Sequence, residues 1–214
     1  MKLVYFQLFF FMVFLATCGG AKAPTLGENA PAFHVKTAQG EATFPDDFLG
    51  GWTLLMSVPN IMTPVCSMEL AKCVQMAEQW KDLHIRTLVL TCHESAQQQF
   101  WLESVLQKEK KNASEENLPF LVPDPEKKIA HLYGMIHPFV TNEKPIRALF
   151  VIDPVGKIRF VAFYPMKNGR NFEEITRIIA AMQQTDAHGG AVTLPDWKLG
   201  DETSICVPCT QLHK

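Results

Sequence analysis

Apolar runs of two kinds predict the first half of the fold. The short runs 53–58 and 85–91 are continuous and suit β-strands, while apolar residues between them recur at helical spacing from Leu70 to Trp80. Strands that are apolar on both faces and are joined by a helix are typical of a parallel β-α-β unit. We therefore expect the central sheet to begin with two parallel strands and a helix that starts at Pro64.

The second half of the chain follows a different pattern. The runs 148–152 and 157–164 flank Asp153-Pro154-Val155-Gly156, a turn sequence that predicts an antiparallel hairpin. The clearest helix covers 171–183, with Asn171 as its N-cap. Further helices are predicted at 95–111 and 126–133, and a further strand at 118–122. This order predicts an α/β protein of thioredoxin-like fold, with a mixed central sheet flanked by helices.

The N-terminal segment differs in composition from the rest. After Met1-Lys2, the run 3–16 is almost wholly apolar and is followed by small residues. A basic start, a short apolar run and small residues are typical of a secretory signal peptide, whereas a membrane-spanning helix needs about 20 apolar residues. We expect residues 1–22 to direct export, with an uncleaved anchor or a wrongly assigned start as alternatives.

The end of this segment raises a second question. Leu15-Ala16-Thr17-Cys18 resembles the bacterial lipobox, in which the cysteine is acylated, although Thr17 stands where Gly, Ala or Ser is usual. Free export to a secreted or periplasmic location and a membrane tether through a lipid on Cys18 are therefore both open.

Composition agrees with one folded domain. The 214 residues carry a net charge of −2, and 47% are hydrophobic, which suits a globular domain with a substantial core. This charge balance gives no reason to expect a nucleic-acid partner. We assign 24–184 to the domain and 185–214, which is rich in Gly and Pro and has little periodicity, to a C-terminal extension.

Cys66 is the strongest candidate for chemistry. Thr63 is a natural N-cap and Pro64 suits the first helical position, so Cys66 falls in the first helical turn. Unpaired backbone N–H groups and the helix dipole there favour a thiolate over a thiol. The sulfur is in phase with Leu70 and Cys73, so it points toward the protein. A small buried hydrophobic residue is the alternative interpretation.

Arg147 is the second candidate. It shares one face of an apolar strand with Leu149 and Val151, where a charge is costly unless it is paired. A thiolate at the neighbouring helix start is one candidate partner, and a nearby acidic residue is another. The third alternative is that Arg147 lies at the exposed end of the strand and needs no partner. Glu69, one turn into the helix, either orients this arginine or is simply a favourable first-turn carboxylate.

The spacing Pro59-x-x-x-Thr63-x-x-Cys66 resembles the signature of the peroxiredoxin family, and the resemblance extends from about residue 25 to 208. The landmarks that carry it are Gly27 to Phe33, Leu118-Pro119-Phe120, Asp124, Tyr164-Pro165, Gly169 to Ile175 and Pro195 to Asp201. The last three are similar to the one-cysteine subgroup in particular.

This resemblance implies a thioredoxin-like fold with a C-terminal segment, usually as a homodimer. It implies a thiol peroxidase that reduces hydrogen peroxide and alkyl hydroperoxides through a sulfenic acid on Cys66, with no metal or organic cofactor. Thr63 and Arg147 would contact peroxide and sulfur, Pro59 would shield the pocket, and Arg170 would be a second nearby arginine. The reductant would be an external thiol, from a thioredoxin-like protein or glutathione.

Two positions depart from the subgroup. Val58 stands where a histidine is usual, so that Ser57-Val58-Pro59 resembles the thiol peroxidase branch of the superfamily. The stretch Leu49 to Trp52 lacks the serine to which some relatives' phospholipase activity is attributed, so we expect no such activity from it.

The cysteine that resolves the sulfenic acid stays open. Cys73 lies seven residues beyond Cys66, about 10 Å along a helix, too far for a disulfide, and we expect it and Cys92 to be structural. Cys206 and Cys209 form a C-x-x-C pair, of which one could resolve Cys66 across a dimer interface. The pair could instead form its own disulfide, or bind a metal with two further ligands.

Two other classes of function compete with the peroxidase. A thiol-disulfide oxidoreductase of the thioredoxin superfamily would want a cysteine at both ends of the sequence Thr63-Pro64-Val65-Cys66, and the first is missing. A secreted binding or signalling relative without peroxidase turnover is the other alternative.

Overall fold

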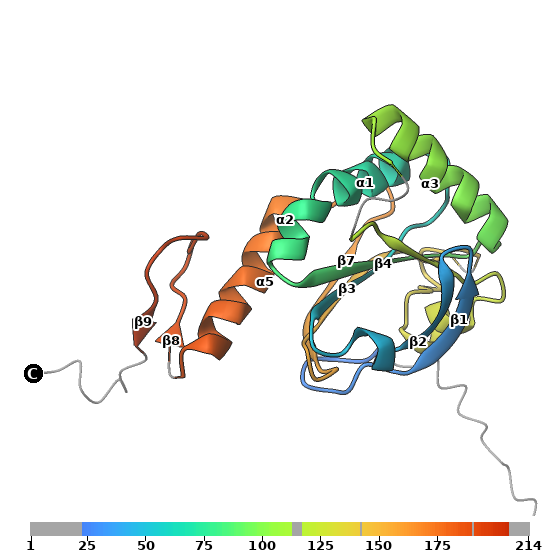
Figure 1. Cartoon of the computed structure of the whole chain (residues 1–214). Coiled ribbons are helices and arrows are strands. Elements are labelled where there is room, and N and C mark those ends of the chain that lie inside the picture. The colour runs from blue at the N-terminus through green and yellow to red at the C-terminus, as the bar shows by residue number, and fades with distance from the viewer. Residues whose placement is uncertain (1–22, 113–116, 142, 190, 206–214) are drawn as a thin grey trace, which may run out of the picture.

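The computed structural model describes residues 23–112, 117–141, 143–189 and 191–205. Its centre is a mixed five-stranded sheet of strand order β5-β4-β3-β6-β7 (Figure 1). The strands are β3 (Trp52–Ser57), β4 (Ile85–Thr91), β5 (Phe120–Pro123), β6 (Arg147–Ile152) and β7 (Ile158–Tyr164). The pairs β3–β4 and β4–β5 are parallel, whereas β3–β6 and β6–β7 are antiparallel. The predicted parallel start and antiparallel hairpin are both confirmed.

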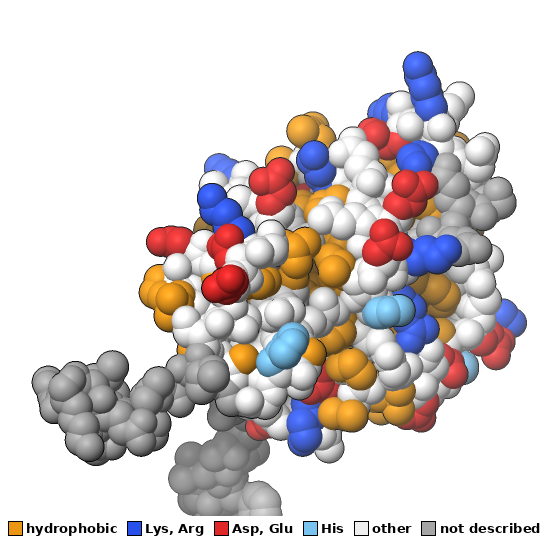
Figure 2. Space-filling view, turned by 60° about the vertical axis from the view of Figure 1, so that its left-hand side comes forward, with side chains coloured by type: hydrophobic (Ala, Val, Ile, Leu, Met, Phe, Trp, Pro, Cys, Tyr) orange, Lys and Arg blue, Asp and Glu red, His pale blue; other side chains and the backbone are white. Residues whose placement is uncertain are grey.

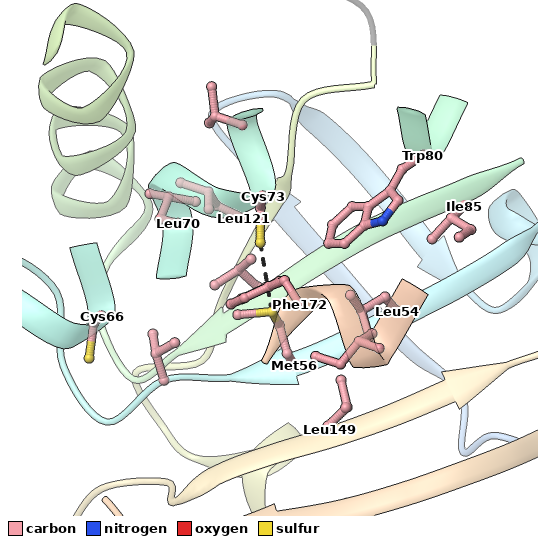
Figure 3. Packing of buried hydrophobic residues seen from close by; sticks show 14 of the residues in the cluster. Leu54, Met56, Cys66, Leu70, Cys73, Trp80, Ile85, Leu121, Leu149 and Phe172 are labelled. Carbon is pink, nitrogen blue, oxygen red and sulfur yellow. Dashed lines mark hydrogen bonds between the residues drawn. The ribbon is translucent and has the colours of Figure 1, made fainter. Parts of the chain in front are cut away.

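Helices cover one face of this sheet. They are α1 (Pro64–Gln75), α2 (Ala77–Asp82), α3 (Ser95–Glu109) and α5 (Phe172–Ala187). Their apolar side chains pack with Leu54 and Met56 of β3 and Leu149 of β6, in the cluster of Figure 3. Because strand side chains alternate between faces, Arg147 lies on this same helix-covered face of β6.

The opposite face is covered by a hairpin and short helices. These elements are β1 (Phe33–Thr37), β2 (Gly40–Phe44), the 3₁₀ turn η1 (Asp46–Phe48) and α4 (Lys128–Leu132), packed on Leu55 and Phe150 of the sheet. The β1–β2 hairpin was not predicted. Of its strand residues only Val35, Ala42 and Phe44 are buried. The sequence therefore lacks the run of apolar residues that predicts a strand.

Several helix boundaries differ from the prediction. The single helix expected to run from Pro64 to about residue 81 breaks at Met76, whose backbone (φ −89°, ψ 0°) ends α1 and begins α2. Helix α4 begins at Lys128 and not at 126, because Asp124 accepts hydrogen bonds from the backbone N–H groups of Ile129 and Ala130 and caps the helix from outside. At α5 the predicted cap is present, as Asn171 Oδ1 accepts from the backbone N–H of Glu174 at 3.1 Å.

The C-terminal extension packs on the final helix. Helix α5 runs to Ala187, so its last residues fall in the segment predicted as extension. Beyond it, β8 (Ala191–Val192) and β9 (Ser204–Ile205) form an antiparallel pair at the end of α5 (Figure 1). Trp197 is buried against Ala180 and Ala181 of α5.

The predicted signal segment 1–22 and the C-x-x-C pair Cys206/Cys209 lie outside the described residues. Across the part of the chain that the structure does describe, no helix is long and apolar enough to cross a membrane. On the face shown in Figure 2, acidic and basic side chains are interspersed with apolar ones.

A buried hydrogen bond between α2 and α5 gives a stability prediction. The Trp80 indole N–H donates to Thr176 Oγ1 at 2.8 Å, and both residues are buried. Thr176→Val keeps the side-chain volume but leaves the indole N–H unsatisfied, so we expect the free energy of unfolding to fall by about 1–3 kcal/mol in urea denaturation. The half-buried Thr185 on the same helix is the control, and Thr185→Val should change the free energy of unfolding by less than about 0.5 kcal/mol. Equal effects of the two substitutions would contradict a stabilising role for the Trp80–Thr176 hydrogen bond.

Candidate active site

Cys66 lies in the first turn of α1, as the sequence predicts. Thr63 occupies the N-cap position with an extended backbone, and Pro64 is the first helical residue. The Thr63 hydroxyl, however, makes no capping hydrogen bond; the first helical bond runs from the Ser67 N–H to the Thr63 carbonyl at 2.9 Å. This hydroxyl is therefore available to the cavity beside Cys66. Only 1% of Cys66 is exposed.

Arg147, the first residue of β6, faces the sulfur. Its Nη1 donates to Cys66 Sγ at 3.4 Å and also to Glu69 Oε2 at 2.7 Å, while its Nε donates to the Met166 carbonyl at 2.9 Å. The sequence suggested either a thiolate or a carboxylate as the partner of Arg147. In the structure Nη1 contacts both the Cys66 sulfur and the Glu69 carboxylate. A guanidinium held against sulfur stabilises negative charge on it.

Glu69 and Arg170 form a buried layer behind this contact. The Glu69 carboxylate accepts from Arg170 Nε at 3.0 Å, from Arg170 Nη2 at 2.7 Å and from the Arg170 backbone N–H at 3.0 Å. Arg170 Nη1 also donates to the carbonyls of Ser57 and Ala148. No hydrogen bond joins Arg170 to Cys66; Arg170 holds Glu69, which in turn holds Arg147.

Ser57 fixes the start of β6, a role that the sequence reasoning missed. Its buried hydroxyl donates to the Ile146 carbonyl at 2.6 Å and accepts from the Ala148 N–H at 3.0 Å. These two residues flank Arg147, so the serine fastens the arginine's backbone to the end of β3. A hydroxyl residue at the end of a strand that is mostly apolar was the available signal.

The charges of this cluster balance only when the sulfur is counted. Arg147 and Arg170 bring two positive charges and Glu69 one negative charge, all with exposed fractions of 7% or less. Buried charge is costly unless it is compensated. One further negative charge, such as a thiolate at Cys66 would bring, would make the cluster neutral.

The sulfur opens onto a cavity of about 390 Å³. It is lined by Pro59, Asn60, Thr63, Pro64, Val65, Cys66, Lys144, Arg147, Met166 and Lys167. The structure thus brings together all four predicted catalytic residues: Pro59, Thr63, Cys66 and Arg147. The two lysines were not predicted, because nothing in the local sequence indicates that their segments meet at this cavity.

The other described cysteines lie in different surroundings. Cys73 is buried in the core with its Sγ 3.9 Å from Met56 Sδ, and Figure 3 shows it well apart from Cys66. Burial raises the pKa of the Cys73 thiol to about 12. Burial, with the nearby Asp124 carboxylate, raises the pKa of Cys92 to about 11. Both are free thiols, as is Cys66, whereas Cys18, Cys206 and Cys209 lie outside the described residues.

Known proteins share this sequence and architecture. A model of the AhpC/TSA family matches residues 26–161. A peroxiredoxin of Methanosarcina mazei is 34% identical over 187 residues, covering 86% of this chain and 85% of the relative. One of Aquifex aeolicus is 38% identical over 175 residues, covering 81% and 76%.

Solved structures agree with these relatives. A mutant of peroxiredoxin 6 of Arenicola marina superposes with a TM-score of 0.76 at 30% identity, covering 86% of this chain and 84% of that one. Yeast mitochondrial 1-Cys peroxiredoxin, solved for its thiol-resolving mechanism via glutathione/thioredoxin systems, gives 0.76 at 28% identity, covering 85% and 86%.

Thiol reactivity should separate Cys66 from the other described cysteines. With pKa values of about 12 and about 11, Cys73 and Cys92 stay almost wholly protonated at pH 7. We therefore expect iodoacetamide at pH 7 to alkylate Cys66 in the native protein at least about tenfold faster than either. Peptide mapping by mass spectrometry measures this, and the denatured protein, in which all three should react, is the control. Equal native rates for Cys66 and Cys92 would contradict the account.

Proposed function

The chain belongs to the AhpC/TSA family and is a peroxiredoxin of thioredoxin-like fold, a thiol-dependent peroxidase, and we propose that Cys66 is the thiolate that attacks the peroxide. The observation that carries this assignment is the 3.4 Å contact between Arg147 Nη1 and Cys66 Sγ at the wall of the cavity. Neither Cys73 nor Cys92 lines that cavity.

In the proposed reaction the Cys66 thiolate attacks the terminal oxygen of the hydroperoxide. The S–O bond forms as the O–O bond breaks, which oxidises the sulfur to a sulfenic acid, Cys-SOH. The departing alkoxide, or hydroxide from hydrogen peroxide, takes a proton from solvent and leaves as an alcohol or water.

The residues around the sulfur have distinct roles in this step. The Thr63 hydroxyl and the N–H groups of the first turn hold the two peroxide oxygens. The Arg147 guanidinium stabilises the charge that develops on the departing oxygen. Pro59, on the cavity wall, limits the access of water to the sulfur. Glu69 and Arg170 hold Arg147 in place.

Reduction of the sulfenic acid needs a thiol. A thiol attacks the sulfenic sulfur, forms a disulfide with Cys66 and releases water, and a second thiol then restores the thiolate. We propose an external thiol, from a thioredoxin-like protein or glutathione, or one of Cys206 and Cys209. Mass spectrometry of the oxidised protein distinguishes these routes, because only the second leaves Cys66 bonded to the C-terminal pair. Cys73 is unsuited, since its sulfur is enclosed by the core.

We also propose that the protein is an exported homodimer. The composition of residues 1–22 supports export, freely or with a lipid on Cys18. The edge strand β7 supports dimerisation, because β6 is its one neighbour among the described strands, the 27–29 segment bonds only to its start at Ile158, and it carries the exposed Phe163.

Loss of the thiol should abolish peroxide reduction. We expect Cys66→Ser to lower the rate of hydrogen peroxide consumption by about a thousandfold or more, because no other described thiol lines the cavity. Stopped-flow measurement of peroxide with excess dithiothreitol tests this. Cys92→Ser, which changes a half-buried thiol away from the cavity, is the matched control and should retain the wild-type rate. Equal consumption by wild type and Cys66→Ser would contradict the proposal.

A further inference from the structure

Ser57 is the last residue of β3, and its side chain takes the place of a backbone pair. The ladder between β3 and β6 ends at the pair Met56/Leu149, and the next pair in register would be Ser57 and Ala148. There the Ser57 hydroxyl accepts from the Ala148 N–H at 3.0 Å and donates to the Ile146 carbonyl at 2.6 Å. One side chain thus makes two hydrogen bonds to the start of β6, where the backbone ladder has ended.

The backbone of β6 is tightly turned at the same point. The Ala148 N–H also donates to the Ile146 carbonyl at 3.0 Å, which closes a three-residue γ-turn with Arg147 at its centre. On the other side of the strand, Arg147 is paired with Tyr164 of β7. Because the Ser57 hydroxyl bonds to both ends of the γ-turn, it fixes the direction in which the Arg147 side chain leaves the backbone.

Ser57 is itself held firmly by the sheet. In the parallel pair β3–β4 it lies opposite Leu90, and the next residue, Val58, donates its N–H to the Leu90 carbonyl at 3.1 Å. The Ser57 carbonyl accepts from Arg170 Nη1 at 3.1 Å, and the residue is completely buried. The hydroxyl therefore ties the start of β6 to the central strand of the sheet.

Packing alone does not require a serine at this position. The other residues of β3 are buried and mostly apolar, so an alanine at position 57 would suit the same core. A buried hydroxyl is costly unless it is hydrogen-bonded, and Ser57 makes its two hydrogen bonds to the peptide groups that flank Arg147. The specific effect of the hydroxyl is therefore on the placement of the arginine.

The contact between Arg147 and Cys66 depends closely on that placement. Arg147 Nη1 lies 3.4 Å from the sulfur, and both hydrogen bonding and Coulomb attraction weaken as this distance grows. The guanidinium has two further anchors, the Glu69 carboxylate and the Met166 carbonyl. Loss of the backbone anchor should therefore shift the guanidinium without releasing it, and lower the thiolate fraction of Cys66 only in part.

We propose that Ser57 is a positioning residue for the reaction of Cys66. Its hydroxyl sets the backbone of Arg147, and thereby the stabilisation of the thiolate and the rate at which it attacks peroxide. The inference rests on the proposed peroxidase function and adds to it a residue that does not line the cavity. The Ser57 carbonyl, which binds Arg170, is retained in Ser57→Ala, so the substitution isolates the hydroxyl.

Alkylation of Cys66 by iodoacetamide tests this role without peroxide. Peptide mapping gives the rate from about pH 5 to 9, and urea unfolding shows that each variant is folded. We expect Ser57→Ala to react at pH 7 about three to ten times more slowly than wild type, because less of Cys66 is thiolate. The rising part of its pH–rate profile should lie at higher pH. The rate of Cys66 oxidation by hydrogen peroxide, from stopped-flow fluorescence, should fall by a similar factor.

Three comparisons separate positioning from a general loss of stability. Ser57→Thr keeps the hydroxyl and suits a β-strand, so its rate should stay within about twofold of wild type. Thr176→Val also loses a buried hydroxyl hydrogen bond, but on α5 and away from the site, and it should keep the wild-type rate and profile. In an Arg147→Gln background, Ser57→Ala should change the rate by less than about twofold, because the group that it positions is gone.

Three results would overturn the inference. One is a folded Ser57→Ala protein with the wild-type rate and profile. The second is equal slowing by Ser57→Ala in the wild-type and Arg147→Gln backgrounds, which would show that the serine acts by another route. The third is a Ser57→Thr protein that is as stable as wild type in urea but as slow as Ser57→Ala. Equal peroxide consumption by wild type and Cys66→Ser would instead overturn the proposed function, while the alkylation rates would still decide the role of Ser57.

Discussion

The guanidinium of Arg147 lies between the Glu69 carboxylate, at 2.7 Å, and the Cys66 sulfur, at 3.4 Å, with almost no access to solvent. A cation in such surroundings is stable only when neighbouring groups compensate its charge. Glu69 is already held by Arg170, so the remaining compensation falls to the sulfur. The chemistry of the site and the stability of its buried layer therefore depend on the same electrostatic balance.

Several features of the fold serve this one contact. The antiparallel pairing of β3 with β6 brings Arg147 to the end of β3 where α1 begins, and Ser57 fastens the residues on both sides of it. Strand alternation then directs the arginine to the helix-covered face. Helices α1 and α5 pack on the sheet through one shared apolar cluster. This packing brings Glu69 of α1 into contact with Arg170, which precedes α5.

Local sequence rules pointed to the centre of the site and gave little of its surroundings. The helix start at Pro64 and the cost of an arginine in an apolar strand made Cys66 and Arg147 candidates, and the resemblance to peroxiredoxins supplied their expected roles. The surroundings of Arg170 and Ser57 depend on segments far apart in the chain, which no local pattern reports. The same holds for Lys144 and Lys167, which are ordinary loop lysines in the sequence. Thr63 occupies the predicted N-cap position, but its hydroxyl does not make the capping hydrogen bond that the sequence suggests and instead lines the cavity.

The central claim is that Arg147 holds Cys66 as a thiolate, and thiolate ultraviolet absorbance measures this directly. The absorbance difference between wild type and Cys66→Ser at pH 7 gives the thiolate at this position. We predict a clear thiolate signal for wild type and its loss, by about tenfold or more, when the same difference is measured in an Arg147→Gln background. An unchanged signal in that background would contradict the account.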